Sequence, residues 1–403
     1  MKQKFRLYRI KNDKSRILFE LSKIGVDSYA LYMYEKGIDF CIKVKDLSPG
    51  QANIIKQEAI SVGADVAVCK GTINCKVNKT DILILSNKNN LKKLISKLKK
   101  QPFGLKELAQ CLRKQIVAKN RKYLKLRDKN LKLDRPVVMG ILNVTPDSFS
   151  DGGKYVKESE IIERLKYFYE HNVTIVDIGG ESTRPGSDPV DAEEELKRIK
   201  FAVKEALKMG FIVSVDTYKS LVAKKCLDMG VHLINDISGF KFDSEMPRIC
   251  ADYESAVCLM HIKGTPKNMQ ISPIYENILE EIKIYLENSV ELALDAGISD
   301  ESIIIDPGFG FGKTLEDNYI ILKYLKEFKN LGFPLLAGVS RKSMIGNILG
   351  KDVGERIIGS KVIEAIAISN GADIIRTHDV AELNDVIKLC DFYNKVELYA
   401  RNN

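Results

Sequence analysis

The residues best suited to chemistry are three polar side chains, Asp216, Asn235 and Asp306, each of which ends a short apolar run. A carboxylate in such a place is costly unless a partner compensates its charge. The partner could be a cation or a ligand with N–H donors, because a carboxylate accepts two parallel N–H bonds well. A 2-amino-4-oxo pteridine or guanine presents such an edge. The alternative for Asp216 is helix capping, since a helix is expected to begin near Lys219.

Four basic side chains and one amide end other apolar runs or follow them closely. They are Asn143, Arg184, Lys342, Arg376 and His378. A phosphate is the ligand expected for this set, because barrel enzymes often bind phosphate with their last loops. The amide oxygen of Asn143 suits a hard cation such as Mg2+, which commonly accompanies a diphosphate. An arginine can also lay its planar guanidinium over an aromatic ring.

Eight short apolar runs must position these residues. They are VVMGILNV (137–144), TIVDIGGE (174–181), IVSVDT (212–217), LINDIS (233–238), AVCLMH (256–261), IIIDPG (303–308), PLLAGVSRK (334–342) and DIIRTHD (373–379). Runs of this kind are typical of parallel strands buried on both faces, and stretches of helical period separate most of them. Eight strand-plus-helix units predict an α/β fold, a (β/α)8 TIM barrel whose chemistry lies at the carboxyl ends of its strands. The polar residues are therefore expected at one mouth.

Two long loops follow the first two strands, NVTPDSFSDGG (143–153) and GGESTRPGSDPV (179–190). Their Pro, Gly, Asp and Ser residues disfavour regular structure, so we expect both loops to act as lids over the mouth. The segment PGFGFGKT (307–314) imitates a phosphate-binding loop, but Pro307 stands where that pattern needs glycine. Its glycines are expected to let the backbone approach a ligand, with Phe309 and Phe311 as apolar walls.

The chain divides by length and charge. Residues 1–130 hold 30 Lys and Arg against 11 Asp and Glu, a net charge of +19, whereas the remainder has a net charge of −10. We expect a small α/β domain over 1–116, a basic linker over 117–133 and the barrel over 134–403. The first domain offers no catalytic constellation, and a packing or dimerising role is preferred over nucleic-acid binding.

The cysteines and apolar runs favour a cytoplasmic protein. None of the eight cysteines forms a C-x-x-C pair, so we expect reduced and mostly buried thiols. No apolar run approaches the length of a membrane span, and no apolar segment follows MKQKFRLYRI.

Several long motifs, taken in order, resemble one family. They are MGILNVTPDSFSDGG, IVDIGGESTRPG, DTYK, INDISG, MHIKGTP, DPGFGFGK, GVSRKS and RTHDV. This set resembles the dihydropteroate synthases over about residues 135–385. Thr377 departs from the pattern, since an aliphatic residue is expected there. The first 130 residues lie outside the family's core domain and resemble an extension without an assigned activity.

The resemblance implies a transferase of folate biosynthesis. It would condense 6-hydroxymethyl-7,8-dihydropterin diphosphate with para-aminobenzoate to 7,8-dihydropteroate and diphosphate, with Mg2+. By similarity, the pterin ligands are Asp216, Asn235, Met260, Asp306, Lys342 and Arg376. The diphosphate ligands are Asn143, Arg184, Arg376 and His378, with Asn143 also on the metal. The aminobenzoate ligands are Phe149, Thr183, Pro185, Phe311 and Ser340, beside Lys342.

The expected reaction is dissociative. Diphosphate leaves once cations neutralise its charge, a carbocation remains on the pterin methylene, and the neutral aniline attacks. Lys342, Asp147 and Asp151 are the candidate catalytic residues, the two carboxylates for steadying the cation or loop closure. The family also implies a homodimer through the last barrel helices and sensitivity to sulfonamides.

Two alternatives remain open. One is a pterin-binding corrinoid methyltransferase, which should lack the ESTRPG and SRKS motifs. The other is a nucleic-acid or partner-binding protein that acts through the basic N-terminal domain.

Overall fold

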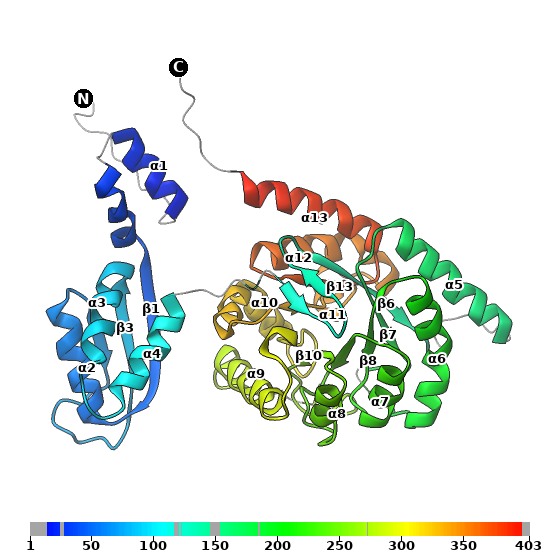
Figure 1. Ribbon diagram of the computed structural model, residues 1–403, viewed down its shortest axis with the longest axis horizontal. Helices are drawn as coiled ribbons and strands as arrows, with labels where there is room; N and C mark the ends of the chain where they lie inside the picture. Colours follow the sequence, from blue (N-terminus) through cyan, green and yellow to red (C-terminus); the bar gives the residue numbers. More distant parts are fainter. Residues whose placement is uncertain are drawn as a thin grey trace. The chain divides into compact units, whose positions relative to one another are not determined.

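The computed structural model describes residues 14–24, 28–116, 121, 123–145, 154–183, 186–271 and 273–396. These residues form two compact units, one within 1–118 and the other within 119–395. Figure 1 colours them along the chain. Each unit is described by itself below.

The N-terminal unit is a three-stranded antiparallel sheet with helices packed on it. The strands are β1 (Asp39–Leu47), β2 (Asp65–Val68) and β3 (Thr80–Asn87), in the order β1-β3-β2. The helices are α1 (Lys14–Ile24), α2 (Pro49–Ser61), α3 (Lys88–Leu98) and α4 (Leu105–Ile116). Ser48 caps α2 in a full capping box, as its place before Pro49 predicts. The expected small α/β unit is therefore present, and the 3-10 helix η1 (Ser28–Gly37) is an element that the sequence did not indicate.

Aliphatic side chains of the sheet and helices form the core of this unit. Ile82, Ile84, Leu91, Leu94 and Leu98 are buried within one cluster. The lysines of α3 occupy the positions between its buried leucines, so the helix is amphipathic. This separation explains how a unit with so many lysines still forms a core.

The second unit is a parallel eight-stranded barrel. The strands are β6 (Val137–Asn143), β7 (Ile175–Gly179), β8 (Ile212–Asp216), β9 (Leu233–Asp236), β10 (Ala256–Met260), β11 (Ile303–Asp306), β12 (Leu336–Ala337) and β13 (Ile374–Thr377). They pair in the order β11-β10-β9-β8-β7-β6-β13-β12. A parallel bridge between Ile305 and Leu335 joins the two ends of this order and closes the barrel. All eight predicted strands are confirmed, and so is the fold class.

Helices surround the barrel strands (Figure 1). They are α5 (Lys154–Glu170), α6 (Ala192–Lys208), α7 (Ser220–Asp228), α8 (Met246–Asp252), α9 (Ile278–Asp295), α10 (Leu315–Lys323), α11 (Ser343–Leu349), α12 (Ile357–Ser369) and α13 (Val380–Lys395). Short 3-10 turns lie at Asp300–Ser302 (η3), Leu325–Leu331 (η4) and Val353–Glu355 (η5). No described helix is both long and apolar enough to span a lipid bilayer.

A hairpin covers the end of the barrel at which the strands begin. It consists of β4 (Tyr123–Lys125) and β5 (Asn130–Lys132). Leu124, Leu126 and Leu131 are buried against the first residues of the barrel strands, among them Ile175 and Leu233. These leucines lie in the segment 117–133, which the sequence predicts to be a basic linker. They are buried because they cover the apolar interior of the barrel at its amino end.

The interior of the barrel changes from apolar to polar along the strands. Alternate residues of a strand point to the same face. Ile175, the first residue of β7, points into the barrel, so Asp177 points into the barrel too. Ser214 of β8 pairs with Asp177, and Asn235 of β9 pairs with Asp216. The register therefore places polar residues of neighbouring strands side by side at two successive levels, two residues apart along β8.

Candidate active site

Asp177 of β7 accepts the hydrogen bonds that connect the polar residues of the barrel mouth, and its side chain is fully buried. Its Oδ1 accepts a hydrogen bond from Ser214 Oγ at 2.5 Å. Its Oδ2 accepts from Arg376 Nε at 2.6 Å and from Asn235 Nδ2 at 3.2 Å. One carboxylate thus joins strands β7, β8, β9 and β13. Since a carboxylate only accepts hydrogen bonds, it fixes which end of the Asn235 amide faces it.

Asp216 lies beside this centre and shares its cation. Arg376 Nη2 donates to Asp216 Oδ2 at 2.8 Å. The other oxygen of Asp216 is buried without a hydrogen-bond partner among the described residues. A buried carboxylate oxygen without a partner is a group that a ligand N–H would satisfy.

Asn143 lies close to the same carboxylate. It pairs with Gly179 across β6 and β7, and Gly179 pairs with Asp216 across β7 and β8. A Cβ built on Gly179 would lie 3.5 Å from Asn143 Oδ1 and 3.6 Å from Asp216 Cβ. The absence of a side chain at Gly179 therefore keeps the space between these two groups open.

Asp306 and Lys342 form the opposite side of the mouth. Asp306 Oδ1 accepts from Gly308 N at 2.7 Å, and Lys342 Nζ donates to the Phe309 carbonyl. The same ammonium lies 4.8 Å from the ring centre of Phe311. Arg341 adopts a left-handed backbone with φ 56°, directly before Lys342. Such a conformation is uncommon for a residue with a side chain and often occurs at functional sites.

The end of β13 supplies a histidine and a hydroxyl network. His378 Nδ1 lies 3.3 Å from Ser340 Oγ, and the His378 backbone N–H donates to the same oxygen at 3.3 Å. Thr377 Oγ1 donates to Glu364 Oε1 at 2.8 Å. The unexpected hydroxyl of Thr377 is therefore buried with a partner, which explains how a polar residue is tolerated there.

Burial shifts the pKa of the ionisable groups. Burial raises the pKa of Asp216 to about 7, although Arg376 opposes the shift. Burial also raises the pKa of Asp306 and lowers that of Lys342 to about 8. Burial lowers the pKa of His378 to about 3, with Arg376 and Arg341 adding repulsion. His378 is thus a neutral imidazole that can donate a hydrogen bond to an anion, whereas Lys342 and Arg376 bring positive charge.

Arg376 keeps its positive charge in spite of its burial. Burial alone would lower the pKa of its guanidinium, but the attraction of Asp177 and Asp216 outweighs burial and raises that pKa. Its ion pairs with these two residues hold the guanidinium between the carboxylates of Asp177 and Asp216. A planar cation in that place can face an aromatic ring or an anion.

The remaining predicted ligands divide between described and undescribed residues. Met260 is buried with Ile237, Ile262 and Met269, next to Phe311. Thr183 is half-buried in the loop after β7. Asp147, Phe149, Asp151, Arg184 and Pro185 lie outside the described residues.

Two predicted details differ in the structure, and one alternative is ruled out. Phe309 is fully buried in the barrel core, so only Phe311 faces the mouth. A Cβ on Gly308 would lie 2.0 Å from the His261 carbonyl oxygen, so this glycine lets two backbone segments pass each other. Asp216 does not cap α7, because the N-cap residue is Lys219.

The cysteines also differ from expectation. Cys226, Cys250 and Cys258 are buried, but Cys41, Cys69, Cys75 and Cys111 are exposed, and all eight are free thiols. Three of the four exposed residues lie in or beside the small sheet, and the fourth lies on α4. The unit that they share is too small to bury every apolar side chain.

Asp177 belongs to one of the eight apolar runs whose polar residues were expected at the mouth, but no ligand or catalytic role was predicted for it. It lies in the middle of a buried strand, where a single carboxylate has no local motif around it. Its signal was a charge inside an otherwise apolar run, which is costly without a partner.

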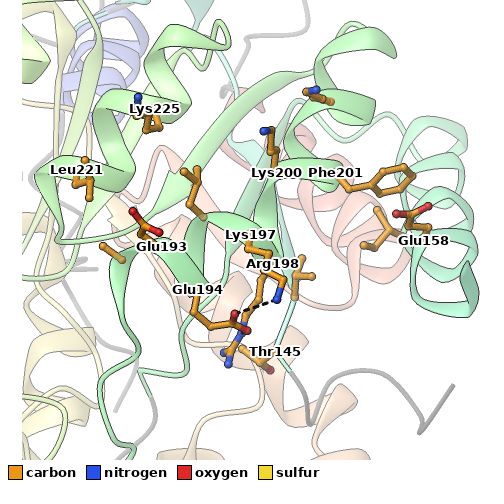
Figure 2. Close-up of a pocket in the computed structure, with 15 residues that line it drawn as sticks. Thr145, Glu158, Glu193, Glu194, Lys197, Arg198, Lys200, Phe201, Leu221 and Lys225 are labelled. Atoms are coloured by element: carbon orange, nitrogen blue, oxygen red, sulfur yellow. Dashed lines mark hydrogen bonds and ion pairs between the residues drawn. The ribbon is translucent and has the colours of Figure 1, made fainter. Parts of the chain in front are cut away.

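A large cavity of about 830 Å³ lies elsewhere, along the outer face of α6. Figure 2 shows its lining, in which Arg198 pairs with Glu194. The charged side chains there are mostly on the helix surface, and none of the predicted ligands lines the cavity. Among the described residues, no group of three His, Cys, Asp or Glu side chains is arranged to hold a metal.

The arrangement can bind a ligand with two different ends. Buried acids accept N–H donors of a flat ring, and Arg376, Lys342 and neutral His378 can bind an anion. Asp216 and Arg376 are in direct contact at 2.8 Å, so both ends must meet in one mouth.

Comparisons with known proteins agree with this arrangement. The family model described as pterin binding enzyme matches residues 139–378. The dihydropteroate synthase of Haemophilus influenzae is 43% identical over 264 residues, which cover 65% of this chain and 95% of the relative. A protein of Helicobacter pylori named bifunctional dihydropteroate synthase/dihydropteroate reductase is 35% identical over 374 residues, covering 92% of this chain and 94% of the relative.

A solved structure adds the same likeness in three dimensions. The Yersinia pestis dihydropteroate synthase, solved with a sulfonamide drug complex, is 41% identical and superposes with a TM-score of 0.65. The match covers 68% of this chain and 100% of that one.

Proposed function

The chain belongs to the dihydropteroate synthase family of pterin-binding enzymes, and we propose on that basis how its barrel joins the pterin to para-aminobenzoate. It is a transferase that condenses 6-hydroxymethyl-7,8-dihydropterin diphosphate with para-aminobenzoate. The observation that carries the assignment of residues is the contact between Asp216 and Arg376 at the barrel mouth. It brings an acceptor for the ring and a cation for the anion together.

The pterin ring binds at Asp216, Asn235 and Asp306, which accept its N–H groups. The Asp216 oxygen that has no partner among the described residues gains a donor in this way. Met260 lines the ring, Lys342 bonds its polar edge, and Arg376 stacks on its face. On binding, Arg376 exchanges part of its contact with Asp216 for the ring and the diphosphate.

The diphosphate binds at Asn143, Arg184, Arg376 and His378. His378 donates a hydrogen bond as a neutral imidazole, and the arginines supply charge. The residues present also fit Mg2+, because Mg2+ takes few protein ligands beside a diphosphate and Asn143 places its amide oxygen beside Gly179. When bound, Mg2+ neutralises charge on the leaving group.

The aminobenzoate binds between Thr183, Pro185, Phe311, Ser340 and Lys342, with Phe149 closing over it. In the reaction the bond between the pterin methylene carbon and the diphosphate oxygen breaks first, and the electron pair leaves with the diphosphate. The amine nitrogen then bonds to the methylene carbon and loses a proton. Asp147 or Asp151 steadies the cation or the closed loop, and Lys342 holds the ring during the step.

The test is product formation by the full chain. With both substrates and Mg2+, mass spectrometry should detect dihydropteroate and an equal amount of diphosphate. Lys342→Ala should lower turnover by about a hundredfold or more while the fold stays intact, as for removal of a contact made in the transition state. Near-normal turnover of this variant would remove Lys342 from its assigned role.

A second activity is proposed from the Helicobacter pylori relative, whose name includes a dihydropteroate reductase. Its alignment extends over 92% of the chain, whereas the alignment with the Haemophilus influenzae synthase covers 65%. The additional similarity lies outside the barrel alignment, so the N-terminal unit is the candidate for the second activity. A reductase must add two electrons and two protons to the remaining C=N bond of the dihydropterin ring.

Reduction is tested with the full chain, dihydropteroate and a reduced nicotinamide. In support of this assignment, mass spectrometry should detect tetrahydropteroate with the full chain. A variant without residues 1–116 should form none, while it keeps its synthase activity. Equal reduction by the deletion variant would place the reductase in the barrel.

The division into 1–116, 117–133 and 134–403 stays a proposal, with the hairpin of β4 and β5 serving the barrel. A cytoplasmic location and a sulfonamide target also remain proposals for this chain. The corrinoid methyltransferase alternative is disfavoured by the relatives named above. Nucleic-acid binding by the N-terminal unit is tested by a salt-dependent gel shift.

A homodimer through the last helices is proposed from their exposed apolar residues. α12 exposes Ile358, Val362 and Ile366, which recur every fourth residue along one face. α13, which packs beside α12, exposes Leu389, Phe392 and Tyr393 to more than 70% each. Exposed apolar residues gathered on two adjacent helices are a feature of protein–protein interfaces.

A further inference from the structure

A buried ion cluster lies behind the loop that follows β7. It consists of Lys219, Glu181 and Glu195, whose side chains are 17%, 5% and 1% exposed. Lys219 follows β8 by three residues and comes directly before α7. None of the ligands assigned above belongs to this cluster, so its purpose is not explained by binding of either substrate.

The three hydrogens of the Lys219 ammonium each have a partner in the loop or just beyond it. Nζ donates to Glu181 at the start of the loop, to the Val190 carbonyl at 2.5 Å at its end, and to Glu195 Oε2 at 2.5 Å in the first turns of α6. A lysine has three donors and no acceptor. Lys219 therefore ties both ends of the loop to a single atom.

Glu181 adds a second set of bonds to the same point. Its Oε1 accepts from Tyr218 Oη at 2.5 Å, and its Oε2 accepts from the Val190 backbone N–H at 3.0 Å. Arg198 of α6, drawn in Figure 2, donates to the Gly180 carbonyl at 3.0 Å. The start of the loop is thus held from β8, from the loop's own end and from α6.

The cluster joins the two substrate sites through short stretches of chain. Thr183, assigned to aminobenzoate, is two residues after Glu181. Asp216, assigned to the pterin, is three residues before Lys219. Without the ammonium, the buried carboxylates of Glu181 and Glu195 would repel each other and lack a counter-charge, which is strongly unfavourable at low exposure. The loop would then move away from the barrel.

We propose that Lys219 is a positioning residue of the synthase reaction, which holds the aminobenzoate loop at a fixed distance from the pterin site through Glu181, Val190 and Glu195. This inference rests on the proposed function of the barrel. Lys219 contacts neither substrate. Its effect should therefore fall on the substrate that binds at the loop and spare the ring that binds at the strands.

The test compares Lys219→Met with Lys224→Met in the full chain. Lys224 is an exposed lysine on α7, five residues after Lys219, so its variant controls for loss of a positive charge in this part of the chain. Lys219→Met should raise the KM for para-aminobenzoate by about tenfold or more, as expected for a misplaced binding loop. The affinity for 6-hydroxymethyl-7,8-dihydropterin without diphosphate, measured by titration calorimetry, should stay within about twofold of the parent chain. Lys224→Met should change neither quantity.

A milder variant keeps the test decisive if Lys219→Met does not fold. Tyr218→Phe leaves the three charges in place and removes only the bond to Glu181, so it should raise the KM for para-aminobenzoate by about two- to fivefold with the same pterin affinity. An unchanged KM in a folded Tyr218→Phe protein, or equal losses for both substrates in Lys219→Met, would overturn the proposal. A parent chain without synthase activity would instead overturn the proposed function, which separates the two failures.

Discussion

At the scale of single residues, the mouth of the barrel works because buried charges compensate one another. Asp177 holds Arg376 and Asn235, and Arg376 in turn reaches Asp216. A buried ion pair gains stability only when its other hydrogen-bonding groups are satisfied. One oxygen of Asp216 lacks a partner among the described residues, so the network is incomplete without a ligand.

The pKa values of this network predict the pH dependence of pterin binding. Burial raises the pKa of Asp216 from 3.8 to about 7, so its carboxylate takes up a proton as the pH falls through 7 and stops accepting two N–H bonds. Burial lowers the pKa of Lys342 from 10.5 to about 8, so its ammonium loses its proton as the pH rises through 8. Affinity for the pterin should be highest between these values and fall about tenfold per pH unit on either side.

Titration calorimetry at several pH values, with 6-hydroxymethyl-7,8-dihydropterin as the ligand, measures this dependence. Asp216→Asn serves as the control, because it should bind weakly and lose the acidic limb. An acidic limb that persists in Asp216→Asn would mean that another group, such as Asp306, controls it.

The sequence predicted most of this chemistry but not its centre. Asp216 and Asp306 are the last residues of their strands and Asn235 is the next to last of its strand, so all three lie at the carboxyl ends where the sequence predicts the site. Asp177 lies inside a strand, and only the barrel register shows that it faces Ser214 and lies at the level of the mouth. Side-chain pairing between distant strands cannot be deduced from local pattern alone.

At the scale of elements, continuous apolar runs identified the eight strands because parallel strands in a barrel are buried on both faces. The hairpin of β4 and β5 escaped prediction, since its strands have three residues each and lie among lysines and arginines. Its buried leucines have meaning only beside the barrel interior. The steric role of the glycines after β11 could not be predicted from the sequence either, because it depends on which backbone segment passes close to them in the fold.

Gly308→Ala tests this crowding. Gly308 has φ +70° and its added Cβ would lie 2.0 Å from a backbone oxygen, whereas Gly210 has φ +85° with open space around it. Gly210→Ala should cost about 1 kcal/mol of unfolding free energy from its backbone conformation alone. Gly308→Ala should cost about 3 kcal/mol or more, because a backbone clash cannot relax cheaply. Urea unfolding measures both values, and equal losses would show that the clash relaxes.

At the scale of the whole molecule, two stretches of opposite net charge share one chain. The residues from 131 onward carry a net charge of −10, and residues 1–130 carry +19. The sequence predicted this division from composition. It did not predict the apolar face of α12 and α13, because the exposed and buried sides of an apolar helix are distinguished only by its packing.

That face should control the oligomeric state. The double variant Ile358→Glu with Leu389→Glu places charges at two positions that are 74% and 73% exposed. Analytical ultracentrifugation should show a dimer for the parent chain and a monomer for this variant, since a buried unpaired charge opposes association by several kcal/mol. A parent chain that is monomeric at micromolar concentration would refute the proposed interface.

The central claim is that the pterin ring and its diphosphate bind side by side in one barrel mouth. It is tested most directly by a crystal structure of the chain with 6-hydroxymethyl-7,8-dihydropterin diphosphate and Mg2+. We predict that the ring contacts Asp216, Asn235 and Asp306 while its diphosphate contacts Arg376 and His378 in the same barrel mouth. A ring bound without contacts to these three residues, or a diphosphate held away from Arg376, would contradict the assignment.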